Sequence, residues 1–243
     1  INMENFNIKS KFVLEKFQFN QNFIIPPVKN MNVDAVINIY ENMRDFFPKY
    51  KENNNDIILA PRLDNILDNF DALLLDAFGV LNVGSSLIPG IIKTLEKARE
   101  KNITLLVVTN GASNDSLKKR DQLASLGLEF SNDEIISSRE TAKIFLSFNQ
   151  PKGPLGVLGN VGNNFNIPNL SCFELEKDLA MFDEMNSFIL LGTLQWDTVW
   201  QKILFNSLKV NPRPLFVANP DLVAPQEKNF SMEPAYYVSH LIK

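Results

Sequence analysis

Two short apolar runs, Ala72–Leu75 and Ile103–Val108, constrain the fold of this chain more than any other feature. Each run has the length of a buried strand and stops at a polar residue, Asp76 after the first and Thr109 after the second. The residues between them, Leu87–Lys101, have helical spacing. A strand, a helix and a second strand in this order form a parallel pair with a right-handed crossover. We therefore expect Asp76 and Thr109 at one edge of a parallel sheet, where open α/β sheets bind ligands.

The alternation of strand and helix patterns continues along the chain. Further helices are expected over Asn114–Leu126 and Ser138–Phe148, on either side of a short strand at Glu134–Ser137. A break rich in proline and glycine follows at residues 150–154, and strand patterns then resume. The elements expected in this second unit are the strands Leu155–Leu158, Ser187–Leu191 and Leu215–Ala218 and the helix Gln195–Lys209. The pattern predicts an α/β fold in two units, the first with a Rossmann-like parallel sheet.

Residues 1–64 differ from the rest of the chain, because they are rich in Asn, Phe and Lys and contain few strand-like runs. Val33–Phe47 has apolar residues at helical spacing, with Asn32 placed to cap the helix and Pro48 placed to end it. We expect a partly helical N-terminal extension that packs on the remainder as an accessory layer.

The ionisable residues limit the available chemistry. His240 is the one histidine, so a multi-histidine zinc site is excluded, and a Ser-His-Asp triad is possible only with that residue. The one cysteine, Cys172, excludes an intrachain disulfide and fits a reducing compartment. The net charge of −4 argues against a nucleic-acid partner. Acid–base and metal chemistry must therefore rest mainly on carboxylates.

The sequence predicts neither a membrane span nor a secretory signal. It has no uncharged apolar run of about 18 residues, the length expected of a spanning helix. Residues 1–10 carry Asn, Glu and Lys where a signal peptide needs apolar residues. We expect a cytoplasmic protein that does not bind membranes.

Asp76 and the turn after it, Ala77-Phe78-Gly79, form the first candidate site. A carboxylate at the end of a buried strand can attack an electrophile or bind a hard cation through oxygen. The alternative is that Asp76 only caps the turn.

Thr109-Asn110-Gly111 is the second candidate, because a hydroxyl, an amide and the N–H groups before a helix make an anion pocket. The alternative is that these are ordinary turn residues.

The two candidates together are more specific than either alone. The chain reads strand-Asp-x-x-Gly-Val-Leu, Pro-Gly, helix and strand-Thr-Asn-Gly, and this order resembles the haloacid dehalogenase-like (HAD) hydrolase superfamily. It is most similar to subclass IIA, which includes nitrophenyl-phosphate and pyridoxal-phosphate phosphatases. The resemblance covers about residues 66–243 and includes Leu126-Gly127, Glu134–Ser138 and Ala218–Asp221.

The resemblance implies an architecture of an α/β core with a large α/β cap. Residues 1–64 would then be the N-terminal extension, 65–148 the first part of the core and 149–232 the cap. Residues 233–243 would begin the return to the core.

The resemblance also implies roles in the core. Asp76 matches the nucleophile, which forms an aspartyl-phosphate intermediate. Its carboxylate and the backbone carbonyl of Phe78 match ligands of Mg²⁺. Thr109 matches the residue that binds the transferring phosphoryl group, with help from the backbone around Asn110 and Gly111. The implied substrate is a small phosphorylated metabolite.

In the cap, Asn219 and Asp221 match an Asn-Pro-Asp motif of the family. They would contact the substrate, or Asp221 would only stabilise a turn. Trp196 and Trp200 are four residues apart on an expected helix. They would pack the cap or form a contact between the caps of a homodimer.

Phe78 departs from the pattern of the family phosphatases. They carry a second aspartate there, which is the general acid for the leaving group and then the base for water, a role worth typically about 10²–10⁴-fold. Phenylalanine carries no proton. Three interpretations follow: a phosphatase, which the cap favours, a dehalogenase-like hydrolase that needs no acid for halide, or a HAD-fold binding protein without catalysis.

The second departure lies at the end of the sequence. In the family a lysine, often in Gly-Lys-Pro, and a Gly-Asp…Asp motif follow the return helix and complete the Mg²⁺ site. Lys243 lies too close to the start of the expected helix to match that lysine, and no acidic motif follows. We expect a fragment of a longer protein or a chain cut to its ordered part, which in this form hydrolyses phosphate esters poorly.

Overall fold

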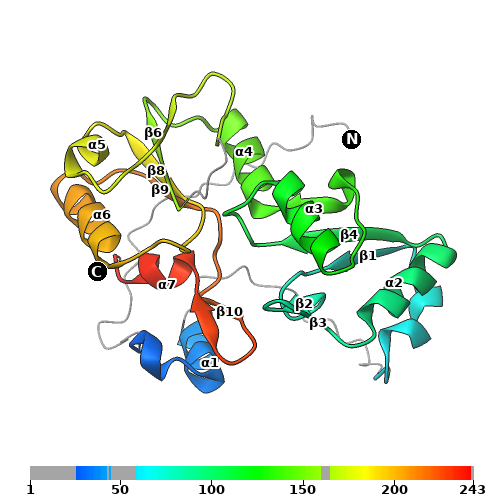
Figure 1. The fold of residues 1–243 in the computed structure, drawn as a ribbon. Coiled ribbons are helices and arrows are strands. Elements are labelled where there is room, and N and C mark those ends of the chain that lie inside the picture. The colour runs from blue at the N-terminus through cyan, green and yellow to red at the C-terminus, as the bar shows by residue number, and fades with distance from the viewer. Residues whose placement is uncertain (1–25, 43, 45–58, 160–164, 242–243) are drawn as a thin grey trace.

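The computed structural model describes residues 26–42, 44, 59–159 and 165–241. Two parallel sheets and their helices make up most of this part of the chain (Figure 1), so the expected α/β class is confirmed. The first unit contains β1 (Ala72–Leu75), α2 (Ile91–Glu100), β4 (Thr104–Thr109), α3 (Ser116–Ser125), β5 (Ile135–Ser137) and α4 (Ser138–Phe148). The second contains β6 (Leu155–Leu158), β7 (Cys172–Glu174), α5 (Leu179–Asp183), β8 (Ser187–Leu190), α6 (Thr198–Val210) and β9 (Leu215–Val217).

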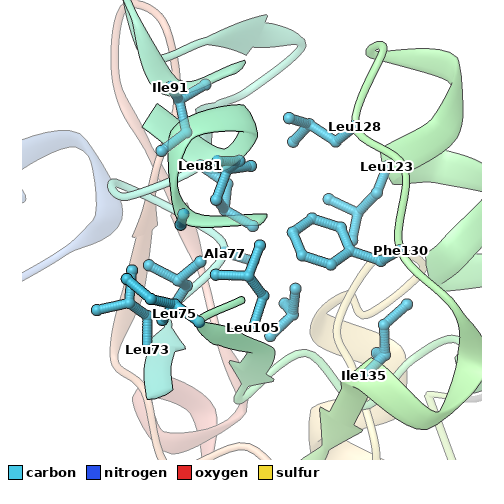
Figure 2. Close-up of a cluster of buried hydrophobic side chains, with 14 of the residues drawn as sticks. Leu73, Leu75, Ala77, Leu81, Ile91, Leu105, Leu123, Leu128, Phe130 and Ile135 are labelled. Atoms are coloured by element: carbon cyan, nitrogen blue, oxygen red, sulfur yellow. The ribbon is translucent and has the colours of Figure 1, made fainter. Parts of the chain in front are cut away.

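The first sheet pairs the two apolar runs as predicted. Its order is β1-β4-β5 with parallel pairing throughout, and Leu75 lies opposite Val107. Side chains from α2 and α3 pack with those of the sheet in a buried core (Figure 2). This core includes Leu73, Leu75, Leu95, Leu105, Leu123 and Phe130. Burying each large apolar side chain contributes roughly 1.5–3 kcal/mol, and this packing holds the carboxyl ends of β1 and β4 together.

The prediction of a helix from Leu87 is wrong for its first turn. Leu87 belongs to a small hairpin made of β2 (Asn82–Val83) and β3 (Ser86–Leu87), and α2 begins only at Ile91. Gly90, just before α2, has a φ of 83°. That left-handed conformation suits glycine and is outside a helix, so the chain turns there before it becomes helical.

The second sheet has the order β7-β6-β8-β9, again with parallel pairs only. Helix α4 packs on one face, and α5 and α6 pack on the other. The central strands β6 and β8 are buried on both faces, which explains their nearly continuous apolar sequences. Because α4 follows β5 directly and covers the second sheet, it links the two units. The predicted boundary between residues 148 and 149 stays a prediction.

Helix α1 (Val33–Asn42) begins where the sequence predicts. Asn32 caps it, since its Oδ1 accepts a hydrogen bond from the Ala35 N–H at 2.9 Å. The predicted end of this helix at Phe47 and Pro48 lies outside the described residues.

The described N-terminal segment packs on the last part of the chain. Ile39 of α1 is buried against the hairpin of β10 (Val223–Pro225) and β11 (Phe230–Met232) and against α7 (Pro234–Ser239). Figure 1 shows α1 lying beside β10 and below α7. The accessory layer therefore covers the segment that follows the second sheet.

Trp196 and Trp200 stack with their ring centroids 5.6 Å apart, and they contact Phe182 and Tyr237. They therefore pack the second unit, one of the two roles predicted for them. A homodimer formed through this unit stays a prediction. In the part of the chain that the structure describes, no helix is long and apolar enough to cross a membrane.

Helix α2 offers a test of the core. Leu95→Ala should lower the free energy of unfolding by about 2–5 kcal/mol, because it leaves a cavity under the first sheet. Ile92→Ala is the matched control on the exposed side of the same helix, and it should cost much less. Urea unfolding followed by circular dichroism measures both, and equal losses would contradict the packing described for α2.

Candidate active site

A cleft of about 860 Å³ lies between the carboxyl edge of the first sheet and the β10–β11 hairpin. It is lined by all the residues of the candidate site predicted from the sequence: Asp76, Phe78, Thr109, Asn110, Gly111, Asn219 and Asp221. These residues come from segments far apart in the chain, so the fold brings the predicted core and cap residues into one site. Their individual roles stay predictions.

Asp76 follows β1 and presents an exposed carboxylate to the cleft. The turn after it is folded tightly, because the Ala77 carbonyl accepts hydrogen bonds from the N–H groups of Leu81 and Asn82. Ala77 is buried, which anchors the turn to the core. No other described residue donates a hydrogen bond to the Asp76 carboxylate. Both oxygens are therefore open to a substrate or a cation.

The end of β4 and the loop after it gather groups that can bind an anion. The buried Thr109 accepts a hydrogen bond at Oγ1 from the Gly111 N–H at 3.2 Å, so its hydroxyl hydrogen stays available to a ligand. Ser138 donates to the Asn110 carbonyl at 2.6 Å and fixes the loop from the side of α4. Asp115 caps α3 by accepting from the Lys118 N–H at 2.8 Å.

Lys119 is a site residue that the sequence reasoning missed. It lies on α3 with only 8% of its surface exposed, and its ammonium is 5.2 Å from the centre of the Phe78 ring. A methyl group added at Gly111 would lie 3.4 Å from Thr109 Oγ1 and 3.5 Å from Lys119 Nζ. The hydroxyl and the ammonium therefore face the same small space. The signal available in the sequence was the spacing of Lys119 and Leu123, which share the buried face of α3.

The buried position of Lys119 affects its charge. Burial lowers the pKa of the ammonium, and the negative charges of Asp76 and Glu233 oppose that shift. No hydrogen bond or close ion pair joins Lys119 to another described residue through its ammonium. A cation held in this way is stabilised by an incoming anion, so the part of the cleft beside Lys119 can receive a negatively charged group.

The opposite wall of the cleft carries two carboxyl groups, Asp221 and Glu233. Asn110 Nδ2 donates to Asp221 Oδ1 at 3.0 Å, which joins the loop after β4 to the Asn-Pro-Asp segment. Asn219 is buried and holds that segment, accepting from the Asp221 N–H at 2.9 Å and donating to Glu233 Oε2 at 3.1 Å. Burial raises the pKa of both carboxyls, although the hydrogen bonds from Asn110 and Ser231 oppose the shift.

The oxygen donors next to Asp76 fit Mg²⁺. This ion is commonly held by one or two carboxylates, with waters and substrate phosphates as further ligands. Besides the open Asp76 carboxylate, the Phe78 carbonyl accepts no hydrogen bond from another described residue. The described residues contain no group of three or more His, Cys, Asp or Glu that could hold a metal. Among the described residues, two protein groups, the Asp76 carboxylate and the Phe78 carbonyl, are therefore suited to hold this ion.

Comparison with known proteins identifies the fold. Residues 73–166 match the family model of the haloacid dehalogenase-like hydrolases. The chloroplastic phosphoglycolate phosphatase 1A of Arabidopsis thaliana is 32% identical over 101 residues, which is 41% of this chain and 28% of that protein. A possible sugar phosphatase of the HAD superfamily from Cytophaga hutchinsonii has a TM-score of 0.62 at 22% identity, covering 73% of this chain and 64% of that one. A glycerol phosphate phosphatase from Mycobacterium tuberculosis, in complex with magnesium, has a TM-score of 0.59 at 19% identity, covering 72% and 52%.

The chain thus has the HAD fold, and its predicted resemblance to this superfamily is confirmed. It spans 28% of the plant relative and at most 64% of the two solved structures.

The anion site can be tested without catalysis. Lys119→Met should weaken the binding of inorganic phosphate about 10–100-fold, because a hydrogen bond to a charged group contributes about 1.5–3 kcal/mol. Lys118→Met changes the exposed neighbour on α3 and should leave the affinity unchanged. Isothermal titration of both variants measures the effect. Equal affinity of the Lys119→Met variant and the unmodified protein would show that this ammonium does not face the anion.

Proposed function

We propose that the protein is a Mg²⁺-dependent phosphatase that hydrolyses monoesters of small phosphorylated metabolites through an aspartyl phosphate on Asp76. One observation carries the proposal. The open Asp76 carboxylate lies in the same cleft as the Thr109 hydroxyl and the Lys119 ammonium. A nucleophile and an anion site in one cleft are what attack on a phosphate ester requires. The match of residues 73–166 to the HAD-like hydrolases supports the same activity.

Asp76 carries out the first step of the proposed reaction. One carboxylate oxygen attacks phosphorus, the bond between phosphorus and the ester oxygen breaks, and the alcohol leaves. Water then attacks the phosphorus of the aspartyl phosphate, which releases inorganic phosphate and restores the carboxylate. The turn anchored by Ala77 keeps the carboxylate in place for both steps.

Groups of the β4–α3 region neutralise the phosphoryl oxygens, which is the main catalytic requirement in phosphoryl transfer. The Thr109 hydroxyl and the backbone near Gly111 donate hydrogen bonds, and Lys119 supplies a positive charge. Asp76 and the Phe78 carbonyl would hold Mg²⁺. When bound, the ion supplies further positive charge to the phosphoryl oxygens.

The proposed substrates are phosphate esters of small sugars, polyols or hydroxy acids. The cleft volume of about 860 Å³ is in the range of small-molecule sites. The relatives described above are named for phosphoglycolate, sugar and glycerol phosphate, which share a small oxygen-rich alcohol. The second unit and the β10–β11 hairpin form the wall opposite Asp76, so they would select the alcohol.

Phe78 gives a reason to test two other functions. An aromatic residue at this position is compatible with hydrolysis of a carbon–halogen bond, since halide leaves without a proton, and also with binding that is not followed by turnover. Halide release from a 2-haloacid would support the first alternative. Phosphate-ester binding without phosphate release would support the second.

Asp76→Asn should abolish the hydrolysis of 4-nitrophenyl phosphate by the full-length protein in the presence of Mg²⁺. An amide is a poor nucleophile and cannot form the acyl phosphate. Asp71→Asn is the matched control, because Asp71 is an exposed aspartate before β1, outside the cleft. Retention of turnover by the Asp76→Asn variant would refute Asp76 as the nucleophile.

Removal of divalent ions should also stop turnover, and Mg²⁺ should restore it. The charged residues of the described cleft are three carboxyls, Asp76, Asp221 and Glu233, and one ammonium, Lys119. A phosphate dianion therefore needs added positive charge to bind beside them. Activity assays in EDTA, followed by titration with Mg²⁺, measure this dependence. Full activity in excess EDTA would contradict it.

A further inference from the structure

The proposed reaction needs a proton carrier that the turn after Asp76 lacks. An alkoxide is a strong base and leaves slowly unless its oxygen is protonated as the bond breaks. Phe78 has no proton to give. The carrier must therefore come from elsewhere in the cleft, where the opposite wall presents the carboxyls of Asp221 and Glu233.

Two parts of the chain hold Asp221 toward the loop after β4. The Asn110 amide contacts its Oδ1 at 3.0 Å, and Asn110 directly follows Thr109 at the end of β4. The next residue, Leu222, is buried, and its N–H donates to Tyr40 Oη of α1 at 3.3 Å. These contacts hold Asp221 against the carboxyl edge of the first sheet, in the cleft that Asp76 also lines.

The hydrogen bonds of the two carboxyls distinguish them. Both oxygens of Glu233 are engaged, Oε1 by Ser231 at 2.8 Å and Oε2 by Asn219 at 3.1 Å. Asp221 Oδ1 is engaged by Asn110, whereas no described residue bonds Oδ2. Glu233 therefore holds the loop, and Asp221 keeps one oxygen that can carry a proton to a ligand.

The surroundings of Asp221 make its carboxyl easier to protonate than a carboxyl free in water. Burial raises the pKa of this carboxyl, the Asn110 hydrogen bond opposes the shift, and the negative charge of Asp76 adds to it. Glu233 and Tyr40 interact electrostatically with Asp221, and the Lys119 ammonium interacts in the same way with Glu233. A bound phosphate ester adds negative charge and favours protonation further.

We propose that Asp221 is the general acid and base of the reaction, in the place that Phe78 cannot fill. This inference rests on the proposed function. As Asp76 attacks phosphorus and the ester bond breaks, the proton on Asp221 Oδ2 passes to the leaving oxygen, and the neutral alcohol departs. The Asp221 carboxylate then takes a proton from the water that attacks the aspartyl phosphate. Inorganic phosphate leaves, and Asp76 and protonated Asp221 are restored.

Asp221→Asn tests this role, because the new amide oxygen can still accept the hydrogen bond from Asn110. With 4-nitrophenyl phosphate the leaving group needs little protonation, so the rapid first release of nitrophenol by the full-length protein should stay close to the unmodified rate. The later turnover should fall about 10²–10⁴-fold, because water loses its base. Aspartyl phosphate should accumulate. The measurement is transfer of label from the phosphoryl group of the substrate to the protein, with release of that label by hydroxylamine. With glycerol phosphate, an alkyl ester, the rate of the first step should fall as well, because the leaving alkoxide needs a proton.

Two further variants separate this role from a structural one. Glu233→Gln should show no such split between first release and turnover. Phe78→Asp in the Asp221→Asn background should restore turnover of the alkyl ester, which also shows that the variant folds. With 4-nitrophenyl phosphate, a parallel loss of first release and turnover in Asp221→Asn, unchanged turnover, or the same split in Glu233→Gln would overturn the inference. If the unmodified protein forms no phosphoenzyme, the proposed function fails, and this inference fails with it.

Discussion

The parallel pairing of β1 with β4 is the constraint on which the rest of the site depends. Leu75, the last residue of β1, lies opposite Val107. Asp76, directly after β1, and Thr109, the last residue of β4, therefore lie near each other at the same edge of the sheet. The buried leucines under the sheet fix this register, because a slip of one residue would turn the apolar side chains of a strand to its other face. A packing interaction, made by buried apolar side chains alone, thus places the proposed nucleophile near the proposed anion site.

The charge balance of the cleft follows from what the other segments add to this edge. Lys119 adds one buried cation, and Asp221 and Glu233 add two carboxyls to that of Asp76. This combination does not by itself neutralise a phosphate dianion, which accounts for the proposed need for Mg²⁺. One of these carboxyls, that of Asp221, has a pKa raised by burial, so it takes up a proton more readily. The same excess of negative charge that hinders binding can thus provide an acid.

Much of this arrangement could be predicted from the sequence, because the strands of parallel sheets are short, apolar and followed by polar residues. The ends of β1 and β6 were predictable for this reason, that of β4 to within one residue, and so was the placement of Asp76 and Thr109 in one cleft. Lys119 was not, since its spacing from Leu123 places it on the apolar face of α3 but does not show that its ammonium reaches the cleft. The hairpin that replaces the first turn of α2 depends on the backbone freedom of Gly84 and Gly90. The pairing of Asn110 with Asp221 joins residues 111 positions apart and follows only from the assembled fold.

The central claim is that Asp76 becomes phosphorylated. The most direct test is to quench the full-length protein during turnover of a phosphate ester with Mg²⁺, reduce it with borohydride and sequence its peptides by mass spectrometry. Borohydride converts an aspartyl phosphate into homoserine and leaves a free aspartate unchanged. The account predicts homoserine at residue 76, and only when substrate is present. An unchanged Asp76 during steady turnover, or homoserine at another position, would contradict it.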